Sequence, residues 1–175
     1  VTASAPKAEY QEGSTGESQR EMLEPYELTP EQHRELQIYC EKHAITFLST
    51  PFDSQSLALL DDLDMAAIKI GSGELTNTPF LREIAQLDRP MIVSTGMSTM
   101  EEVEVAVEAI RDASANVPVA LLHCVSLYPT DINLANLRTM HAFDDRFDAP
   151  IRFSDYTTRV APMRLPAVIG ATITV

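Results

Sequence analysis

The sequence predicts an α/β fold, specifically a (β/α)8 TIM-type barrel that is incomplete in this chain and comprises about strands 3 to 8 of the eight. Three observations support this class. Short apolar runs recur along the 175 residues, helix-length segments with recognisable start signals lie between them, and the two alternate strictly from Thr29 onward. A strict alternation of strand and helix is typical of βα units around a parallel sheet.

The predicted strands are short and almost continuously apolar, as expected for strands buried on both faces of a parallel sheet. Their residue ranges are 45–49, 66–70, 90–94, 118–122, 150–154 and 171–175.

The predicted helices begin at clear capping signals. Thr29, Pro30 and Gln32 form a capping box with proline at the first helical position. Further helix starts are predicted at 53–54, 78–79 and 98–102. In the last of these helices, an apolar stripe faces the core. The stripe consists of Val103, Ala106, Val107 and Ile110.

Residues 1–28 are polar and irregular, and we interpret them as a long βα loop with one short helix near 17–23. We therefore expect residues 1–175 to form a single partial barrel domain, with successive βα units over 29–175. A helix ahead of the first strand implies that the barrel order begins upstream of Val1. The competing doubly wound fold would usually carry a G-x-G-x-x-G turn after its first strand, and the sequence contains none.

Charge and composition exclude several classes of function. The chain has 13 Lys and Arg against 26 Asp and Glu, a net charge of −13, which would repel a nucleic-acid backbone. No apolar run approaches the ~18 residues that a membrane span needs. Two cysteines make no disulfide framework, which favours a reducing cytoplasm. Strong acidity with only three lysines suggests a surface adapted to high salt.

Polar and reactive residues gather where the predicted strands end, which is the face of a βα barrel that carries active sites. Hydroxyls accompanied by one lysine supply the neutral donors and the point charge that a phosphate requires. The segments are Ser49–Asp53, Lys69–Glu74, Ser94–Met97, His123–Pro129 and Ser154–Thr157. They predict a site for a phosphorylated or strongly anionic small molecule.

In order and spacing, these five segments resemble the N-acetylneuraminate (sialic acid) synthase family, which includes legionaminate and pseudaminate synthases and related spore-coat proteins. The resemblance runs over essentially the whole chain. It implies a barrel that condenses phosphoenolpyruvate with an N-acetylated amino sugar of the N-acetylmannosamine type, giving a nonulosonic acid and phosphate. It also implies a divalent metal, manganese or magnesium, that polarises the sugar aldehyde, and a homodimer in the full-length protein.

The resemblance assigns roles residue by residue. Six residues would line the phosphate of phosphoenolpyruvate: Thr50, Lys69, Ser72, Ser94, Ser126 and Ser154. Glu74 and Tyr128 would face the amino sugar, and Glu74 and Lys69 would be the catalytic residues. Independently of the family, a lysine within an apolar strand is costly unless an anion meets it.

The sequence departs from the family pattern after residue 150. Tyr156 stands at a metal-binding histidine position, and the family's second histidine would follow Val175. Arg152 replaces a small residue, and Pro166 interrupts an expected helix. Two strands, with a lysine for the phosphoenolpyruvate carboxylate, would precede Val1, and an antifreeze-like domain would follow the chain. We therefore expect the isolated chain not to turn over substrate.

Two other functions stay open on the sequence. The chain fits a non-catalytic homologue that keeps the anion pocket, and it fits a phosphate-handling aldolase that uses Lys69 as a Schiff-base lysine. The sequence does not decide whether His123 and Cys124 have structural or catalytic roles. They do not form a zinc site by themselves, because a lone His-Cys pair lacks the required spacing.

Overall fold

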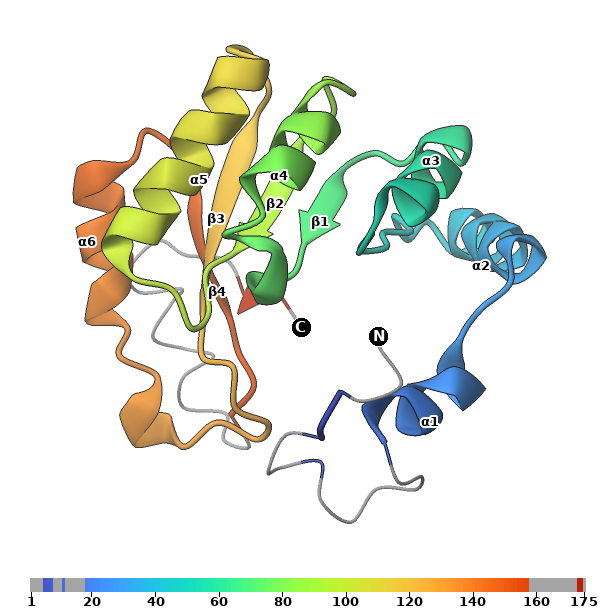
Figure 1. Cartoon of the computed structure of the whole chain (residues 1–175), viewed down its shortest axis with the longest axis horizontal. Helices are drawn as coiled ribbons and strands as arrows, with labels where there is room; N and C mark the ends of the chain where they lie inside the picture. The colour runs from blue at the N-terminus through green and yellow to red at the C-terminus, as the bar shows by residue number, and fades with distance from the viewer. Residues whose placement is uncertain (1–4, 8–10, 12–17, 158–172, 175) are drawn as a thin grey trace. The chain divides into compact units, whose positions relative to one another are not determined.

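The computed structural model describes residues 5–7, 11, 18–157 and 173–174. Its internal contacts divide the chain into two compact units, Val1–Ile45 and Thr46–Val175. The first unit contains α1 (Gln19–Leu23), the 3₁₀ turn η2 (Glu24–Tyr26) and α2 (Pro30–Lys42). The second contains α3 (Ser54–Asp62), β1 (Ile68–Ile70), η3 (Ser72–Glu74), α4 (Thr78–Ala85), β2 (Met91–Ser94), α5 (Met100–Ala113), β3 (Val119–Cys124), η4 (Ile132–Leu134), α6 (Arg138–Arg146), β4 (Ile151–Ser154) and β5 (Ile173–Thr174) (Figure 1).

In the first unit, α2 begins at the predicted capping box. The Gln32 N–H donates to Thr29 Oγ1 at 3.2 Å, and the Thr29 N–H donates to Gln32 Oε1 at 2.7 Å. Pro30 occupies the first turn, where its missing N–H costs nothing. The short helix expected near 17–23 is α1, capped by the Ser18 hydroxyl.

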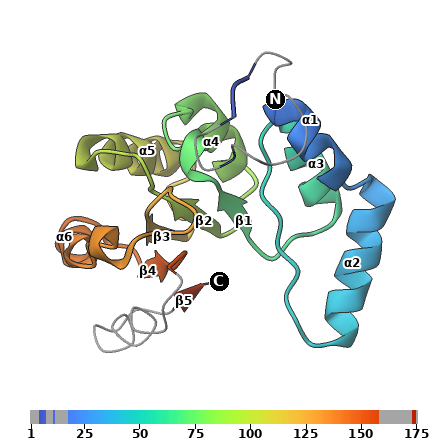
Figure 2. The ribbon, with the colours of Figure 1, turned by 90° about the horizontal axis from the view of Figure 1, so that it is seen from below.

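The second unit is built on a five-stranded sheet in which every neighbouring pair is parallel. The spatial order β1-β2-β3-β4-β5 follows the order along the chain. Helices α4, α5 and α6 lie along one face of this sheet, which curves like part of a barrel wall (Figures 1 and 2). The predicted α/β fold is confirmed.

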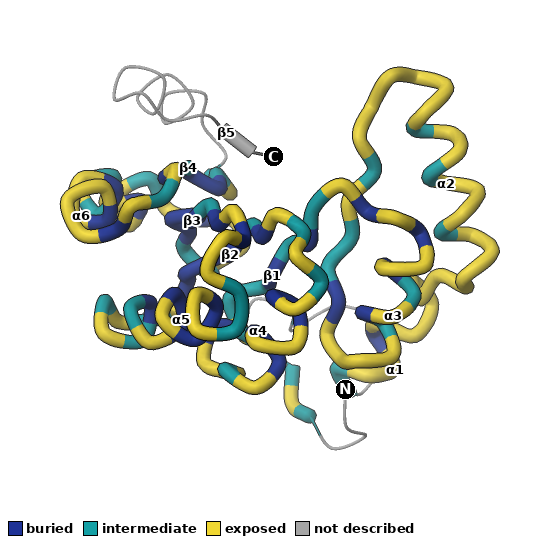
Figure 3. The backbone as a smooth tube through the Cα atoms, turned by 90° about the horizontal axis from the view of Figure 1, so that it is seen from above, coloured by how far each residue is buried: buried dark blue, intermediate teal, exposed yellow. Residues whose placement is uncertain are grey.

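The strand register gives the sheet two chemically different faces. Ile68 pairs with Met91, and Leu121 pairs with Ile151, so these side chains share the face that packs against the helices. They belong to one continuous hydrophobic core. Most residues of β1 to β4 are buried, whereas α4 and α5 present exposed residues on their outer sides (Figure 3).

The helix starts of this unit agree with the capping signals. Asp53 caps α3 by accepting from the Ser56 N–H at 2.7 Å, a bond that lowers the pKa of Asp53. Thr99 caps α5 through a capping box with Glu102. The apolar stripe of α5 is buried as predicted. Helix α4 is capped by Asn77, one residue before the expected Thr78.

The predicted strand over 45–49 is wrong. This segment has no ladder partner among the described residues, and Ile45 and Leu48 are exposed. Its β-branched and apolar composition favours a strand, but a strand is stabilised only when a neighbour satisfies its backbone groups. The strands predicted over 66–70, 90–94 and 150–154 form with shorter bounds, and the strand predicted over 118–122 forms as Val119–Cys124, ending two residues further along. Of the last predicted strand, 173–174 is described, and Pro166 lies outside the described residues.

Among the described residues, no helix combines the length and apolarity needed to cross a bilayer.

Candidate functional site

Lys69 brings a positive charge to the face of the sheet that carries Ser94. It lies on β1 between Ile68 and Ile70, which are fully buried on the opposite face. Its Nζ donates to the hydroxyl of Ser94, the last residue of β2, at 3.2 Å. Ser94 is 4% exposed. A half-buried ammonium held beside a buried hydroxyl is suited to bind an oxyanion.

Gly96 is the point on which three loops converge. Its backbone N–H donates to Ser72 Oγ at 3.0 Å, and Ser72 Oγ lies 3.4 Å from Cys124 Sγ. A Cβ added at Gly96 would collide with Ser126 Oγ and would lie 2.9 Å from Ser72 Oγ and 3.2 Å from Cys124 Sγ. The loops after β1, β2 and β3 therefore bring polar atoms to one place, and any side chain at Gly96 would displace them.

The other predicted phosphate residues lie around these two groups. Ser154 is buried at the end of β4, where its Cα pairs with that of Cys124 in the ladder. The Thr50 methyl carbon lies 4.0 Å from a Cβ built on Gly71, the residue that follows β1. The structure thus brings Lys69 to Ser94, and it brings Ser72 and Ser126 together at Gly96. Ser154 lies beside Cys124, and Thr50 lies beside Gly71.

The two residues expected to face the sugar lie in loops at the same end of the sheet. Glu74 ends the turn η3, and its Oε2 accepts from Asn77 Nδ2 at 2.9 Å. Tyr128, in the loop after β3, packs its ring against that of Tyr156 with centroids 4.5 Å apart.

Arg152 lies two residues before Ser154 on β4 and therefore shares a face with it, as strand alternation predicts. Its Cα pairs with that of Leu122 on β3. Its Nη1 donates to the carbonyl of the preceding residue, Ile151, at 2.8 Å. This bond turns a half-buried guanidinium back towards its own strand.

Cys124 belongs to the site, although the sequence analysis left its role open. Side chains alternate along a strand, so Cys124 falls on the same face as Ser154, whereas His123 falls on the opposite face. This alternation is the signal that could have separated the two residues.

His123 occupies a structural environment. Its Nε2 lies 2.7 Å from the Ala135 carbonyl, and its ring packs against Phe153. Burial lowers the pKa of His123, and the hydrogen bond to Ala135 only partly opposes that effect. His123 therefore links β3 to the loop that carries Ser126 and Tyr128.

The residues near Tyr156 do not fit the divalent metal that the resemblance implies. Asp155 is the neighbouring carboxylate, and its Oδ1 already accepts from the Thr157 N–H at 2.8 Å. No three His, Cys, Asp or Glu side chains in the described residues gather as metal ligands. From Tyr156 to Val175 the sequence has no such residue. A neutral phenol is a poor replacement for imidazole as a ligand of a divalent metal.

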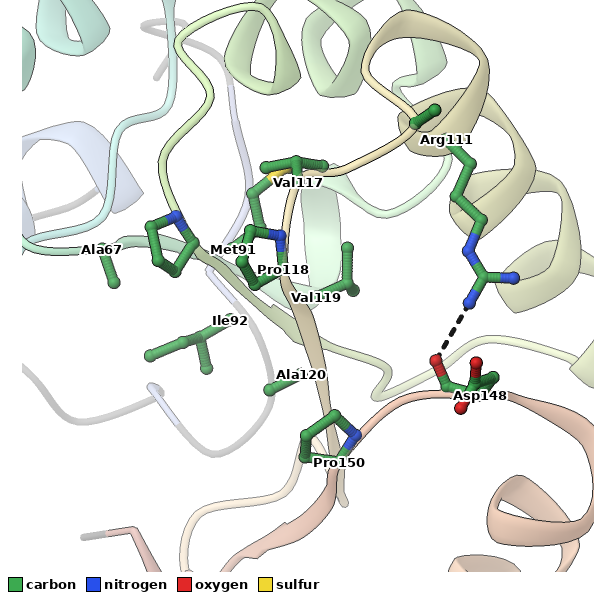
Figure 4. A pocket seen from close by; sticks show the side chains of 12 residues that line it. Ala67, Met91, Ile92, Arg111, Val117, Pro118, Val119, Ala120, Asp148 and Pro150 are labelled. Carbon is green, nitrogen blue, oxygen red and sulfur yellow. Dashed lines mark hydrogen bonds between the residues drawn. The ribbon is translucent and has the colours of Figure 1, made fainter.

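A cavity of about 520 Å³ lies at the opposite, amino-terminal end of the strands (Figure 4). Its lining includes Ala67, Pro118 and Pro150, each of which immediately precedes a strand. Arg111 closes one side by donating to the Asp148 carbonyl at 3.0 Å. The cavity has a mixed polar and apolar lining and contains none of the predicted site residues.

Comparison with known proteins gives consistent results. The model of the NeuB family matches residues 1–174. The chain is 37% identical over 176 aligned positions to an N,N'-diacetyllegionaminic acid synthase of Campylobacter jejuni, covering 99% of this chain and 53% of that protein. It is 35% identical over 174 positions to an N-acetylneuraminate-9-phosphate synthase of Drosophila melanogaster, covering 98% of this chain and 46% of that protein. It spans about half the length of these relatives.

Solved structures agree on the fold. An N-acetylneuraminic acid synthetase from Leptospira borgpetersenii, crystallised with citrate, superposes with a TM-score of 0.83 at 29% identity, covering 87% of this chain and 53% of that one. A truncated 3-deoxy-D-arabino-heptulosonate 7-phosphate synthase from Thermotoga maritima superposes with a TM-score of 0.73 at 18% identity, covering 85% and 60%. The latter likeness establishes the fold alone.

Proposed function

The chain belongs to the NeuB family, and from this premise we propose that it binds phosphoenolpyruvate for condensation with an N-acetylated amino sugar. The product would be a nonulosonic acid, and phosphate would be released. The sugar we propose is of the N-acetylmannosamine type. Two observations at the carboxyl end of the sheet carry the proposal. Lys69 donates a hydrogen bond to Ser94, and the hydroxyls of Ser72 and Ser126 lie together at Gly96.

Lys69 would balance the charge of the phosphate group. Its Nζ has three N–H donors, and the bond to Ser94 engages one of them. Ser94 accepts this bond, so its own hydroxyl proton is available to a phosphate oxygen. The pair would thus present a cation and a neutral donor to the same anion.

Ser72 would act in the same way. Because its Oγ accepts from the Gly96 N–H, its hydroxyl proton is directed elsewhere, either to Cys124 Sγ or to a bound anion. Ser126, which approaches Gly96 from the loop after β3, would supply a further donor. Fixed donors of this kind stabilise charge without reorganising during the reaction.

The proposed chemistry joins C3 of phosphoenolpyruvate to the aldehyde carbon of the sugar, and the aldehyde oxygen takes up a proton to become a hydroxyl. Water then adds at C2, and the phosphate leaves with its bridging oxygen. We assign Glu74 to the sugar hydroxyls or the aldehyde, with its carboxylate steadied by Asn77. No step is assigned to a metal, because the donors around Tyr156 do not fit one.

Calorimetric titration with phosphoenolpyruvate tests the proposal. We expect the chain to bind it and Lys69→Met to weaken binding by about tenfold or more, because a charge-assisted bond to the anion is lost. Lys42→Met, at the end of α2, is the matched control and should bind as the unmodified chain does. Absence of binding, or equal affinity in the two variants, would contradict the proposal.

A second candidate is a non-catalytic homologue that binds a phosphorylated ligand, and Tyr156 at the metal position favours it. The two candidates differ in turnover. Formation of a nonulosonic acid by the 175-residue chain from phosphoenolpyruvate and N-acetylmannosamine would exclude the non-catalytic homologue.

A further inference from the structure

Tyr128 and Tyr156 form an aromatic pair at the carboxyl end of the sheet. Their ring planes meet at 74° in an edge-to-face arrangement, with the centroids 4.5 Å apart. Tyr128 is 41% exposed and Tyr156 is 37% exposed. Each ring therefore keeps a substantial surface available to a ligand while it contacts the other.

The backbone holds this pair in place. The Thr130 N–H donates to the Tyr156 carbonyl at 2.9 Å, and Thr130 forms a parallel bridge with Thr157. The Thr130 hydroxyl in turn donates to the Leu127 carbonyl at 2.6 Å, which closes the loop that carries Tyr128. These bonds join the loop after β3, which carries Tyr128, to the loop after β4, which carries Tyr156. The backbone of both loops therefore fixes the positions of the two rings.

The pair lies close in the chain to the anion residues. Tyr156 is two residues beyond Ser154, and Tyr128 is two residues beyond Ser126. Asp155 lies between Ser154 and Tyr156, and its Oδ2 is buried with no hydrogen-bond partner among the described residues. An unpaired buried carboxylate oxygen is costly, and a hydroxyl or amide N–H from a ligand would satisfy it.

We propose that Tyr156, together with Tyr128, is a specificity-determining residue that packs against the N-acylated amino sugar, in place of a metal ligand at that position. This inference rests on the proposed function. A sugar ring has apolar C–H faces edged by hydroxyls, and tyrosine offers an apolar ring with a polar tip. The acyl methyl group and a C–H face would lie against the rings, and Asp155 Oδ2 would accept from a sugar hydroxyl or the amide.

The test is calorimetric titration of the whole chain with N-acetylmannosamine in the presence of saturating inorganic phosphate. We expect binding that is unchanged by EDTA. Tyr156→Ala should weaken it by about tenfold, whereas Tyr156→Phe should change it by less than about threefold, because the phenyl face remains. Tyr26→Ala removes a tyrosine that is 75% exposed in the other unit, and it should bind as the unmodified chain does.

Two further measurements keep the outcomes distinct. The chain has no tryptophan and five tyrosines, so the near-ultraviolet circular dichroism of tyrosine reports the pair, and Tyr156→Phe should change it. Phosphoenolpyruvate affinity should be equal in Tyr156→Ala and the unmodified chain, which also shows that the variant is folded. If the unmodified chain does not bind phosphoenolpyruvate, the result refutes the proposed function rather than the role of Tyr156. Sugar binding that EDTA abolishes, that Tyr156→Ala leaves unchanged, or that is absent while phosphoenolpyruvate binds would overturn the inference.

Discussion

Gly96 is the residue on which the geometry of the proposed anion site depends most closely. Its N–H orients the Ser72 hydroxyl, and its missing side chain leaves the space in which Ser72, Ser126 and Cys124 approach one another. The neighbours are side-chain atoms at the ends of strands and in tight loops, and a Cβ would force all three apart.

Gly96→Ala should therefore weaken phosphoenolpyruvate binding by about tenfold or more, because displaced hydroxyls no longer converge on the phosphate. Gly73→Ala is the matched control, since a Cβ at Gly73 meets nothing within 4 Å. Calorimetry on both variants measures the effect. Equal affinities in the two variants would show that the space above Gly96 is not part of the site.

His123 makes stability depend on pH. Burial lowers the pKa of His123 in the folded chain, so the unfolded chain binds a proton more readily. The free energy of unfolding should therefore fall as the pH drops below about 6.5, and the loss should be complete below the lowered folded-state pKa. Urea unfolding between neutral and mildly acid pH measures this slope.

The variant His123→Gln should reduce that slope while keeping a donor for the Ala135 carbonyl. His141→Gln, exposed on α6, should leave it unchanged. An unaltered slope in His123→Gln would contradict the assignment.

Individual residues of the site were predictable from the sequence to different degrees. Hydroxyls at strand ends located Ser72, Ser94, Ser126 and Ser154, because parallel strands bring their carboxyl ends to one edge. The Gly96 N–H was not predictable, because backbone donors leave no mark in residue type.

At the scale of secondary structure, α5 shows how one stripe of residues fixes a helix to the sheet. Val103 is fully buried in the core, whereas Val105, two residues along on another side of the helix, is 54% exposed. The two valines lie on the same helix and differ in burial, so they separate packing from helix propensity.

Val103→Ala should lower the free energy of unfolding by about 2 kcal/mol, through lost burial and an unfilled cavity. Val105→Ala should change it by less than about 0.5 kcal/mol, since alanine is the better helix former and little surface is uncovered. Urea denaturation of both variants provides the measurement, and similar losses would refute the burial argument.

Helices were more predictable than strands, for a physical reason. The caps at Thr29, Asp53 and Thr99 act within four residues, so their signals are local. The segment 45–49 has strand composition, but strand formation depends on a partner far away in the chain. Local composition could not supply that partner.

At the scale of the whole molecule, charge and topology follow from the sequence most directly. The strict alternation of strand and helix predicted the parallel sheet. The contact between Tyr128 and Tyr156 did not follow from the sequence pattern, because a bridge between the loops after β3 and β4 brings the two rings together.

The net charge of −13 has a consequence for the whole chain. Like charges repel one another in the folded state, and salt screens that repulsion over a Debye length of about 10 Å at 0.1 M. The free energy of unfolding should therefore rise with KCl concentration. Thermal unfolding across a KCl series measures this, and a flat response would contradict the idea of a surface adapted to high salt.

The most direct measurement is a phosphoenolpyruvate titration followed by the backbone amide resonances of the chain. We predict that the amides of Gly96, Ser72 and Ser126 shift together with one dissociation constant, because they surround one oxyanion. Shifts confined to Ala67 and Ala120, around the cavity at the amino ends of the strands, would place the ligand at the wrong end of the sheet and contradict the proposed site.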